Sequence, residues 1–173
     1  MNEPYLYALV STYVPEHFSS LTQLADGHLI KEARDGCTYA NGVLHSFNDQ
    51  PACIDVHGCQ IWYRLGKMHR DNDLPALTDA FGTRVWYQYG LRHRTNDLPA
   101  SIWADGTREW QQHGQWHRDN DQPAVIWVDG TQEWWQHSKL HRDNDQPAII
   151  WADGKQSWYR NGIFMYSCTN FHL

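Results

Sequence analysis

The chain has 173 residues, with 20 acidic against 14 basic side chains and a formal net charge of −6. This balance excludes a general attraction for the phosphate backbone of nucleic acids or for anionic lipid, so we expect no nucleic acid and no membrane among its partners. No 18-residue apolar run occurs, and the Met1 end lacks the layout of a signal peptide, so we expect a soluble cytoplasmic protein.

Residues 1–36 are predicted to form an N-terminal cap, because they match the repeat of the remaining chain poorly. Within this segment, Pro15 to Ala25 is interpreted as a short helix, with Phe18, Leu21 and Leu24 on one side and Gly27 as its stop. A degenerate, shortened copy of the repeat is indicated by Asp35-Gly36 and Asn41-Gly42. Capping units of this kind are what an open repeat array requires.

Residues 37–166 carry five copies of a unit with a period of 24 residues. Four columns recur at that step: His45, His69, His93, His117, His141; Pro51, Pro75, Pro99, Pro123, Pro147; Gly58, Gly82, Gly106, Gly130, Gly154; and Trp62, Trp86, Trp110, Trp134, Trp158. A fixed period of this length is typical of repeat architectures. The predicted fold is therefore mainly β, an elongated array of stacked β-hairpin repeats.

Each unit is predicted to form a hairpin, because two short apolar and aromatic runs, at 124–127 and 131–136, flank a turn with Gly130. The Gly column never varies, whereas the column before it admits His57 and Phe81. A two-residue type I′ turn needs positive φ at both positions, which Phe81 would adopt only at a cost. We therefore predict a three-residue loop that ends on glycine.

This loop fixes which side chains share a face of the sheet, because a shift by one residue exchanges the faces. It places Ala124 opposite Trp134 and Trp127 opposite Thr131. Ala124, Ile126 and Trp134 then share the face with the invariant columns, which we interpret as the core side.

The opposite face varies between the copies, as expected for the surface with which a repeat scaffold contacts a partner. Aromatic and acidic side chains gather on it, and we call the following set the aromatic-acidic strip: Trp103, Trp127, Trp151, Trp135, Glu109, Glu133, Tyr63, Tyr87 and Tyr159. Trp and Tyr are common anchors of protein interfaces. The alternative is that these aromatics pack on each other or on a second layer, and the sequence favours neither.

The repeated histidines and the Asp-Asn-Asp motifs are interpreted as structural rather than metal-binding, and the cysteines as free thiols. Histidines of successive units would lie roughly 9–10 Å apart, which is too far to share a metal ion. Motifs such as Asp71-Asn72-Asp73 resemble the start of a calcium loop but lack its later Gly and Glu, and the neighbouring Arg70 offsets their charge. The four cysteines follow no framework spacing, so free thiols are expected. We expect no catalytic residue, no metal and no cofactor.

Residues 167–173 are predicted to close the other end as a C-terminal cap. The stretch Glu133 to Arg142, with Trp158 to Gly162, resembles the MORN-repeat superfamily, and most closely its divergent bacterial and viral variants, including antitoxin components. The resemblance implies a rod of hairpins that acts as a protein-interaction scaffold. Where MORN repeats have Gly-x-Gly, this chain has His-Arg-Asp-Asn-Asp-x-Pro-Ala.

The resulting prediction is a non-enzymatic module that binds a protein partner through the aromatic-acidic strip, as an inhibitor, immunity or antitoxin-like protein. Two alternatives remain open. The Trp and Tyr stripe could stack on a carbohydrate or another small molecule, or the chain could associate with membranes as other MORN proteins do.

Overall fold

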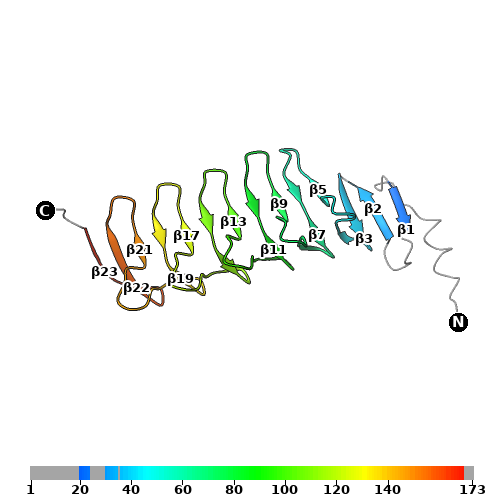
Figure 1. The fold of residues 1–173 in the computed structure, drawn as a ribbon. Helices are drawn as coiled ribbons and strands as arrows, with labels where there is room; N and C mark the ends of the chain where they lie inside the picture. The colour runs from blue at the N-terminus through cyan, green and yellow to red at the C-terminus, as the bar shows by residue number, and fades with distance from the viewer. Residues whose placement is uncertain (1–19, 24–29, 35, 170–173) are drawn as a thin grey trace, which may run out of the picture.

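The computed structural model describes residues 20–23, 30–34 and 36–169, and this part of the chain is all β, without a helix. Figure 1 shows its hairpins in one row, with β1 (Ser20–Gln23) and β23 (Ile163–Cys168) at opposite ends of the row. The expected array of stacked β-hairpins is confirmed.

The main sheet has 15 antiparallel strands in the described residues, and its neighbours follow chain order. The order is β1 (Ser20–Gln23), β2 (Ile30–Arg34), β3 (Cys37–Ala40), β5 (Cys53–Ile54), β6 (Gln60–Ile61), β9 (Leu77–Thr78), β10 (Arg84–Val85), β13 (Ser101–Ile102), β14 (Arg108–Glu109), β17 (Val125–Ile126), β18 (Gln132–Glu133), β21 (Ile149–Ile150), β22 (Gln156–Arg160) and β23 (Ile163–Cys168), with β4 (Val43–Leu44) paired to β3. Each internal unit thus adds two strands.

The loop between these two strands is the predicted three-residue loop. In the unit of β17 and β18, Val125 pairs with Glu133 and Ile126 with Gln132. The Gly130 N–H donates to the Trp127 carbonyl at 3.0 Å, and the Trp127 N–H donates to the Thr131 carbonyl at 2.9 Å. Gly130 has a φ of 92°, a left-handed conformation that glycine adopts without strain.

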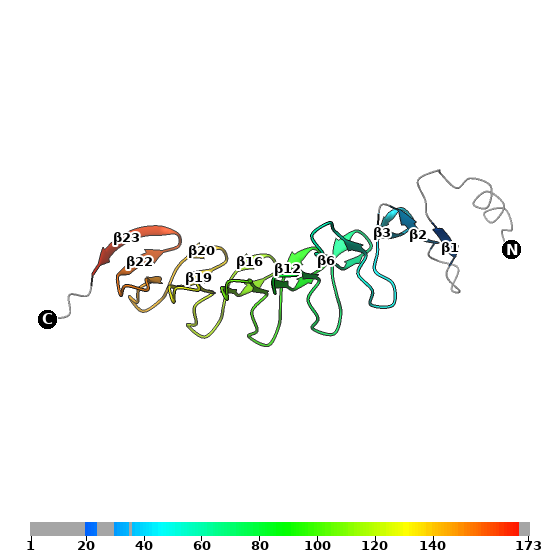
Figure 2. The same cartoon turned by 90° about the horizontal axis from the view of Figure 1, so that it is seen from above.

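A second, smaller hairpin, not predicted from the sequence, follows in each of the first four units, whereas in the last unit β22 pairs with β23 within the main sheet. These hairpins are β7 (Tyr63–Arg64) with β8 (Lys67–Met68), β11 (Tyr87–Gln88) with β12 (Leu91–Arg92), β15 (Gln111–Gln112) with β16 (Gln115–Trp116), and β19 (Trp135–Gln136) with β20 (Lys139–Leu140). Successive small hairpins are bonded to each other, as where the Ser138 N–H donates to the Trp116 carbonyl at 3.0 Å. Figure 2 shows them following one another along the array.

The invariant Ala column is buried, as predicted, and so is the Trp column in the first four units, whereas Trp158 in the last unit is only partly buried. Ala124 is fully buried and Trp134 is 6% exposed. The indole N–H of Trp134 donates to the Asp121 carbonyl at 3.0 Å, and the Arg142 guanidinium covers its ring at 3.9 Å from the centroid. The indole therefore fills the space beneath the loop that carries the Asp and Arg motif.

The opposite face is partly buried too, which agrees in part with the alternative of a second packed layer. Val125, Ser101 and Glu109, which point to the opposite side of the sheet, are also buried, whereas Ile126 on the predicted core side is only partly buried. The reason is the second hairpin of each unit, whose side chains contact that opposite side, as Arg92 contacts Glu109.

The ends of the array differ from the expected caps in one respect. Ser20–Gln23, which falls inside the predicted helix, is strand β1 and pairs with β2. Pairing with a neighbouring strand outweighs the local apolar spacing there, and the rest of the predicted helix lies outside the described residues. At the other end, Tyr166 in β23 stacks on Trp158, with ring centroids 4.6 Å apart, in the place that arginine takes in earlier units.

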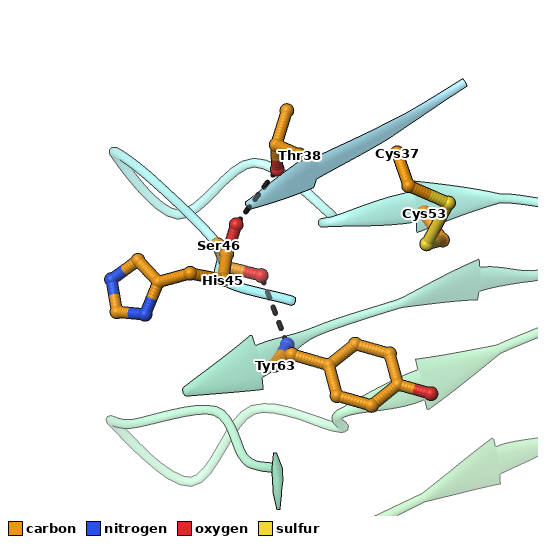
Figure 3. Close-up of a disulfide and its surroundings, with 6 residues drawn as sticks. All are labelled: Cys37, Thr38, His45, Ser46, Cys53 and Tyr63. Atoms are coloured by element: carbon orange, nitrogen blue, oxygen red, sulfur yellow. Dashed lines mark hydrogen bonds between the residues drawn. A yellow bond between two sulfur atoms is a disulfide. The ribbon is translucent and has the colours of Figure 1, made fainter. Parts of the chain in front are cut away.

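The expectation of four free thiols is also wrong. Cys37 and Cys53 face each other on β3 and β5, with Cα atoms 4.3 Å apart, and form a disulfide (Figure 3). Their spacing of 16 residues gave no hint of the pairing, because it follows from the register of β3 on the first unit. Cys59 and Cys168 are free.

Candidate functional site

Two tryptophans of the aromatic-acidic strip are substantially exposed. Trp127 is 42% exposed and Trp151, at the same place in the next unit, is 40% exposed. Trp103, one unit earlier, is partly buried. All three follow the last residue of a strand, β13, β17 or β21, just before the three-residue loop. The strip is therefore buried in part, as at Glu109, and exposed in part, at Trp127 and Trp151.

Trp103 and Glu109 belong to one polar cluster. The Trp103 indole N–H donates to Oε1 of Glu109 at 2.9 Å, and Arg92 and the Gln111 amide reach Oε2 at 3.3 and 3.4 Å. The Arg92 guanidinium lies 5.4 Å from the centroid of the Trp103 ring. Glu109 is only 8% exposed, so its carboxylate is paired and nearly enclosed.

Beside this cluster lies a shallow hollow of about 380 Å³, with Trp103 and Trp127 among its walls. Its other lining residues are Thr83, Ala104, Asp105, Thr107 and Glu109. A hollow bounded by two indoles suits an apolar or planar group.

Glu133 organises the corresponding cluster of the next unit. Its Oε1 accepts the Trp127 indole N–H at 2.9 Å, and its Oε2 accepts the Trp135 indole N–H at 2.8 Å. The ring of Trp116 lies 5.1 Å from that of Trp135. Among the ion pairs of the described residues, none involves Glu133, so this carboxylate is held by indoles alone.

The three tyrosines of the strip are distributed over separate units and all are partly buried. Tyr87 accepts a hydrogen bond from Arg92 Nε at 3.3 Å, and Tyr159 packs edge-on against Phe164 with centroids 5.4 Å apart. Burial raises the pKa of Tyr63. They extend the aromatic surface but join neither carboxylate cluster directly, apart from the contact through Arg92.

Two members of these clusters, Arg92 and Trp116, were missed by sequence reasoning. Both lie on the second strand of a small hairpin, where Arg92 pairs with Tyr87 and Trp116 with Gln111. A signal was available, because five further glycines follow the same 24-residue step, interrupted only by Ser138: Gly42, Gly66, Gly90, Gly114 and Gly162. They mark two-residue turns such as Tyr89-Gly90, whose residues both have positive φ.

Whether a unit has tryptophan in the strip column depends on which residue supplies the carboxylate that accepts the N–H groups of the three-residue loop. Asp79, in the same column as Trp103, accepts the N–H groups of Phe81 and Thr83 at 2.9 and 2.8 Å. In the later units the loop aspartate takes over, as Asp129 accepts the Thr131 N–H at 2.8 Å. The strip column is thereby free for tryptophan in three successive units.

The His, Arg and Asp motif forms the expected hydrogen bonds with loop carbonyls and carboxylates. Arg118 donates to both carboxylate oxygens of Asp97, at 2.7 and 2.8 Å, and to the Pro123 carbonyl at 3.3 Å. His141 is 3.0 Å from Asp143, and its Nδ1 accepts the Asn161 N–H. The hydrogen bond from Arg118 lowers the pKa of Asp97. No group of three or more potential metal ligands occurs among the described residues.

No protein-family model matches the chain, and neither the curated proteins nor the solved structures gave a significant match. Within the described ranges, no helix is long and apolar enough to cross a membrane.

Proposed function

We propose that the chain is a non-enzymatic protein-interaction module that binds a protein partner through the aromatic-acidic strip. The observation that carries the proposal is the exposure of Trp127 and Trp151, at 42% and 40%, in the same place of successive units. Large indoles that remain accessible on a rigid sheet lose little conformational freedom on binding, and Trp is enriched among the residues that dominate interface affinity.

The hydrogen bonds of these indoles support a binding role. Trp127 donates to Glu133 and Trp151 to Ser157, at 2.9 and 3.4 Å, so the polar edge of each ring is satisfied inside the module. What each indole offers to a partner is therefore apolar ring surface in a fixed orientation. Preorganised side chains of this kind reduce the entropic cost of association.

The resemblance of the units to MORN repeats adds the expectation of an interaction scaffold. Carbohydrate binding by the same indoles is the second candidate function. It rests on the hollow between Trp103 and Trp127, because aromatic rings also stack on other planar or apolar surfaces.

Site-specific photocrosslinking tests the proposal. A photoreactive phenylalanine replaces Trp127 or Trp151 in one pair of samples and Leu98 in the control. Leu98 is a matched position, since it is 39% exposed but lies on the Asp and Pro loop, away from the strip. We expect the same protein to be crosslinked from both strip positions in cells of the native host, and not from Leu98.

Crosslinking of that protein from Leu98 but from neither strip position would contradict the proposal. Two further assays separate the alternatives. Binding to a sugar array that is lost in Trp127→Ala would favour carbohydrate recognition, and sedimentation with liposomes of anionic lipid would favour membrane association.

A further inference from the structure

We propose that Glu133, with Trp127 and Trp135, binds the guanidinium of an arginine side chain that the partner inserts into the strip. This inference rests on the proposed function, because it names the chemistry by which the strip recognises its partner. Among the described residues, no cation pairs with Glu133. At the equivalent carboxylate of the preceding unit, Glu109, the cation is the chain's own Arg92.

The preceding unit shows what an equivalent carboxylate binds. Glu109, 24 residues before Glu133, accepts hydrogen bonds from an indole and from Arg92, whose guanidinium also lies near the Trp103 ring. The same combination of carboxylate, indole and guanidinium recurs on the other side of the sheet. There Arg118 pairs with Asp97 and covers the Trp110 ring at 3.9 Å. In both places, therefore, a carboxylate near a tryptophan is paired with a guanidinium that lies near the indole ring.

At Glu133 the cation is replaced by aromatic rings. The position equivalent to Arg92 is Trp116, and the position equivalent to Gln111 is Trp135. Both oxygens of Glu133 accept one indole N–H each, at 2.9 and 2.8 Å, and no ion pair of the described residues involves this carboxylate. Since a carboxylate accepts about four hydrogen bonds, two acceptor positions remain.

The electrostatics of this site favour a cation. The Glu133 carboxylate, bonded by two indoles and partly buried, is partly withdrawn from water without a countercharge, which raises its free energy. The faces of the same indoles carry negative electrostatic potential and attract a cation. Arginine suits the site better than lysine because its planar guanidinium bonds a carboxylate with two N–H groups and stacks on an aromatic face.

The site is accessible from the solvent. Trp127 is 42% exposed, and Glu133 and Trp135 are both partly exposed. Trp127 also borders the hollow shared with Trp103, so a partner side chain can reach the Glu133 cluster along the strip. The net charge of −6 attracts a basic segment over a longer range.

Titration of the full chain with N-acetyl-L-arginine amide tests the site without the partner. The ten indole N–H resonances are followed by NMR, and those of Trp127 and Trp135 are assigned from Trp→Phe variants. We expect these two resonances to shift with the arginine probe and not with the citrulline analogue, which has the same shape but no charge. In Glu133→Gln the affinity for the probe should fall about tenfold, the effect of losing one charge-assisted contact.

Two variants make the result specific. Trp116→Arg with Trp135→Gln rebuilds the arrangement of the preceding unit, so its own arginine should occupy Glu133 and the Trp127 resonance should no longer respond to the probe. Asp119→Asn removes the same charge in the Asp and Pro loop and should leave the response unchanged. Preserved dispersion of the other indole resonances shows that each variant is folded.

Equal shifts with arginine and citrulline probes, or an unchanged response in Glu133→Gln, would overturn the cation site. The proposed function is contradicted by a different result, crosslinking of the partner from Leu98 but from neither Trp127 nor Trp151. The two proposals can therefore be rejected separately.

Discussion

The guanidinium of Arg142 lies 3.9 Å from the centroid of the Trp134 ring and covers an indole that is only 6% exposed. The same arginine donates hydrogen bonds to both carboxylate oxygens of Asp121, at 2.8 Å each, which ties its loop to the loop of the preceding unit. Equivalent contacts occur in three other pairs, Arg70 with Trp62, Arg94 with Trp86 and Arg118 with Trp110. The same arginine therefore both buries the indole and links neighbouring units.

Trp134→Ala tests this arrangement. We expect the free energy of unfolding to fall by about 3–5 kcal/mol, as for other buried aromatic truncations, because the cavity also leaves the Arg142 guanidinium uncovered. Denaturant unfolding of the variant beside Trp127→Ala provides the comparison, since Trp127 is 42% exposed. A larger loss in Trp127→Ala than in Trp134→Ala would show that the two sides of the sheet have been confused.

Acid should weaken the contacts between units. Hydrogen bonds from arginine lower the pKa of Asp49, Asp73, Asp97 and Asp121 below the usual 3.8. A lowered folded-state pKa contributes stability that is fully present above 3.8 and is lost as the pH falls through the folded value. We therefore expect the free energy of unfolding to decrease below about pH 4, a window set by these shifts.

The matched variant for this measurement is Arg118→Gln, which removes the partner of Asp97. Its stability should depend less steeply on pH below 4 than that of the unchanged chain. Burial also lowers the pKa of His45 and His93 from 6.5, so a separate loss of stability begins as the pH falls below about 6.5. The comparison is therefore confined to the window below about pH 4. Parallel pH profiles of the two proteins would contradict the assignment.

The three-residue loop requires glycine only because the backbone there has a positive φ, not because space is lacking for a side chain. Gly130 has a φ of 92°, and an added Cβ would meet nothing within 4 Å. Gly130→Ala should therefore cost about 1–2 kcal/mol through backbone strain without any clash. The converse variant is Ser138→Gly, at the position equivalent to Gly114, where Ser138 has a φ of 59°. It relieves this backbone strain but removes the hydrogen bond that the Ser138 hydroxyl accepts from the Trp116 N–H at 3.1 Å, so stability should change by less than in Gly130→Ala. Thermal unfolding of both variants checks this difference.

The disulfide gives a chemical prediction. Thiol titration of the denatured, unreduced chain should detect two free thiols, Cys59 and Cys168, and reduction should release two more. Replacing Cys37 and Cys53 by serine removes a link across 16 residues, for which the loop-entropy relation gives a loss of about 3 kcal/mol. Four reactive thiols before reduction would disprove the bond.

The main sheet was predictable because one invariant glycine determines its loop and the loop determines its register. The pairing of Val125 with Glu133 follows from Gly130 and the tolerance of Phe81 in the column before it. β1 was not predictable, because Ser20–Gln23 has no strand pattern of its own and is ordered by pairing with β2. The bond between Cys37 and Cys53 likewise depends on register between segments.

The strip was predictable only in part. Its column pattern identifies Trp127 and Glu133 as neighbours, and they are hydrogen bonded. Arg92 could not be identified from the sequence as the partner of Glu109, because that contact requires the small hairpin to pack on the sheet. The turn glycines predict such a hairpin, but not the direction in which it packs.

The affinity of the crosslinked partner for a set of single variants tests the central claim most directly. Trp127→Ala and Trp151→Ala are compared by calorimetry with Leu98→Gln, a control that introduces the residue found at the equivalent Gln122 and Gln146. If the partner binds the strip, either tryptophan variant should lose about 2 kcal/mol or more of binding free energy, roughly thirtyfold in Kd. Both variants should remain folded, and the affinity of the Leu98→Gln control should be unchanged. Unchanged affinity in both tryptophan variants, with the partner still bound, would contradict the claim that the partner binds this face.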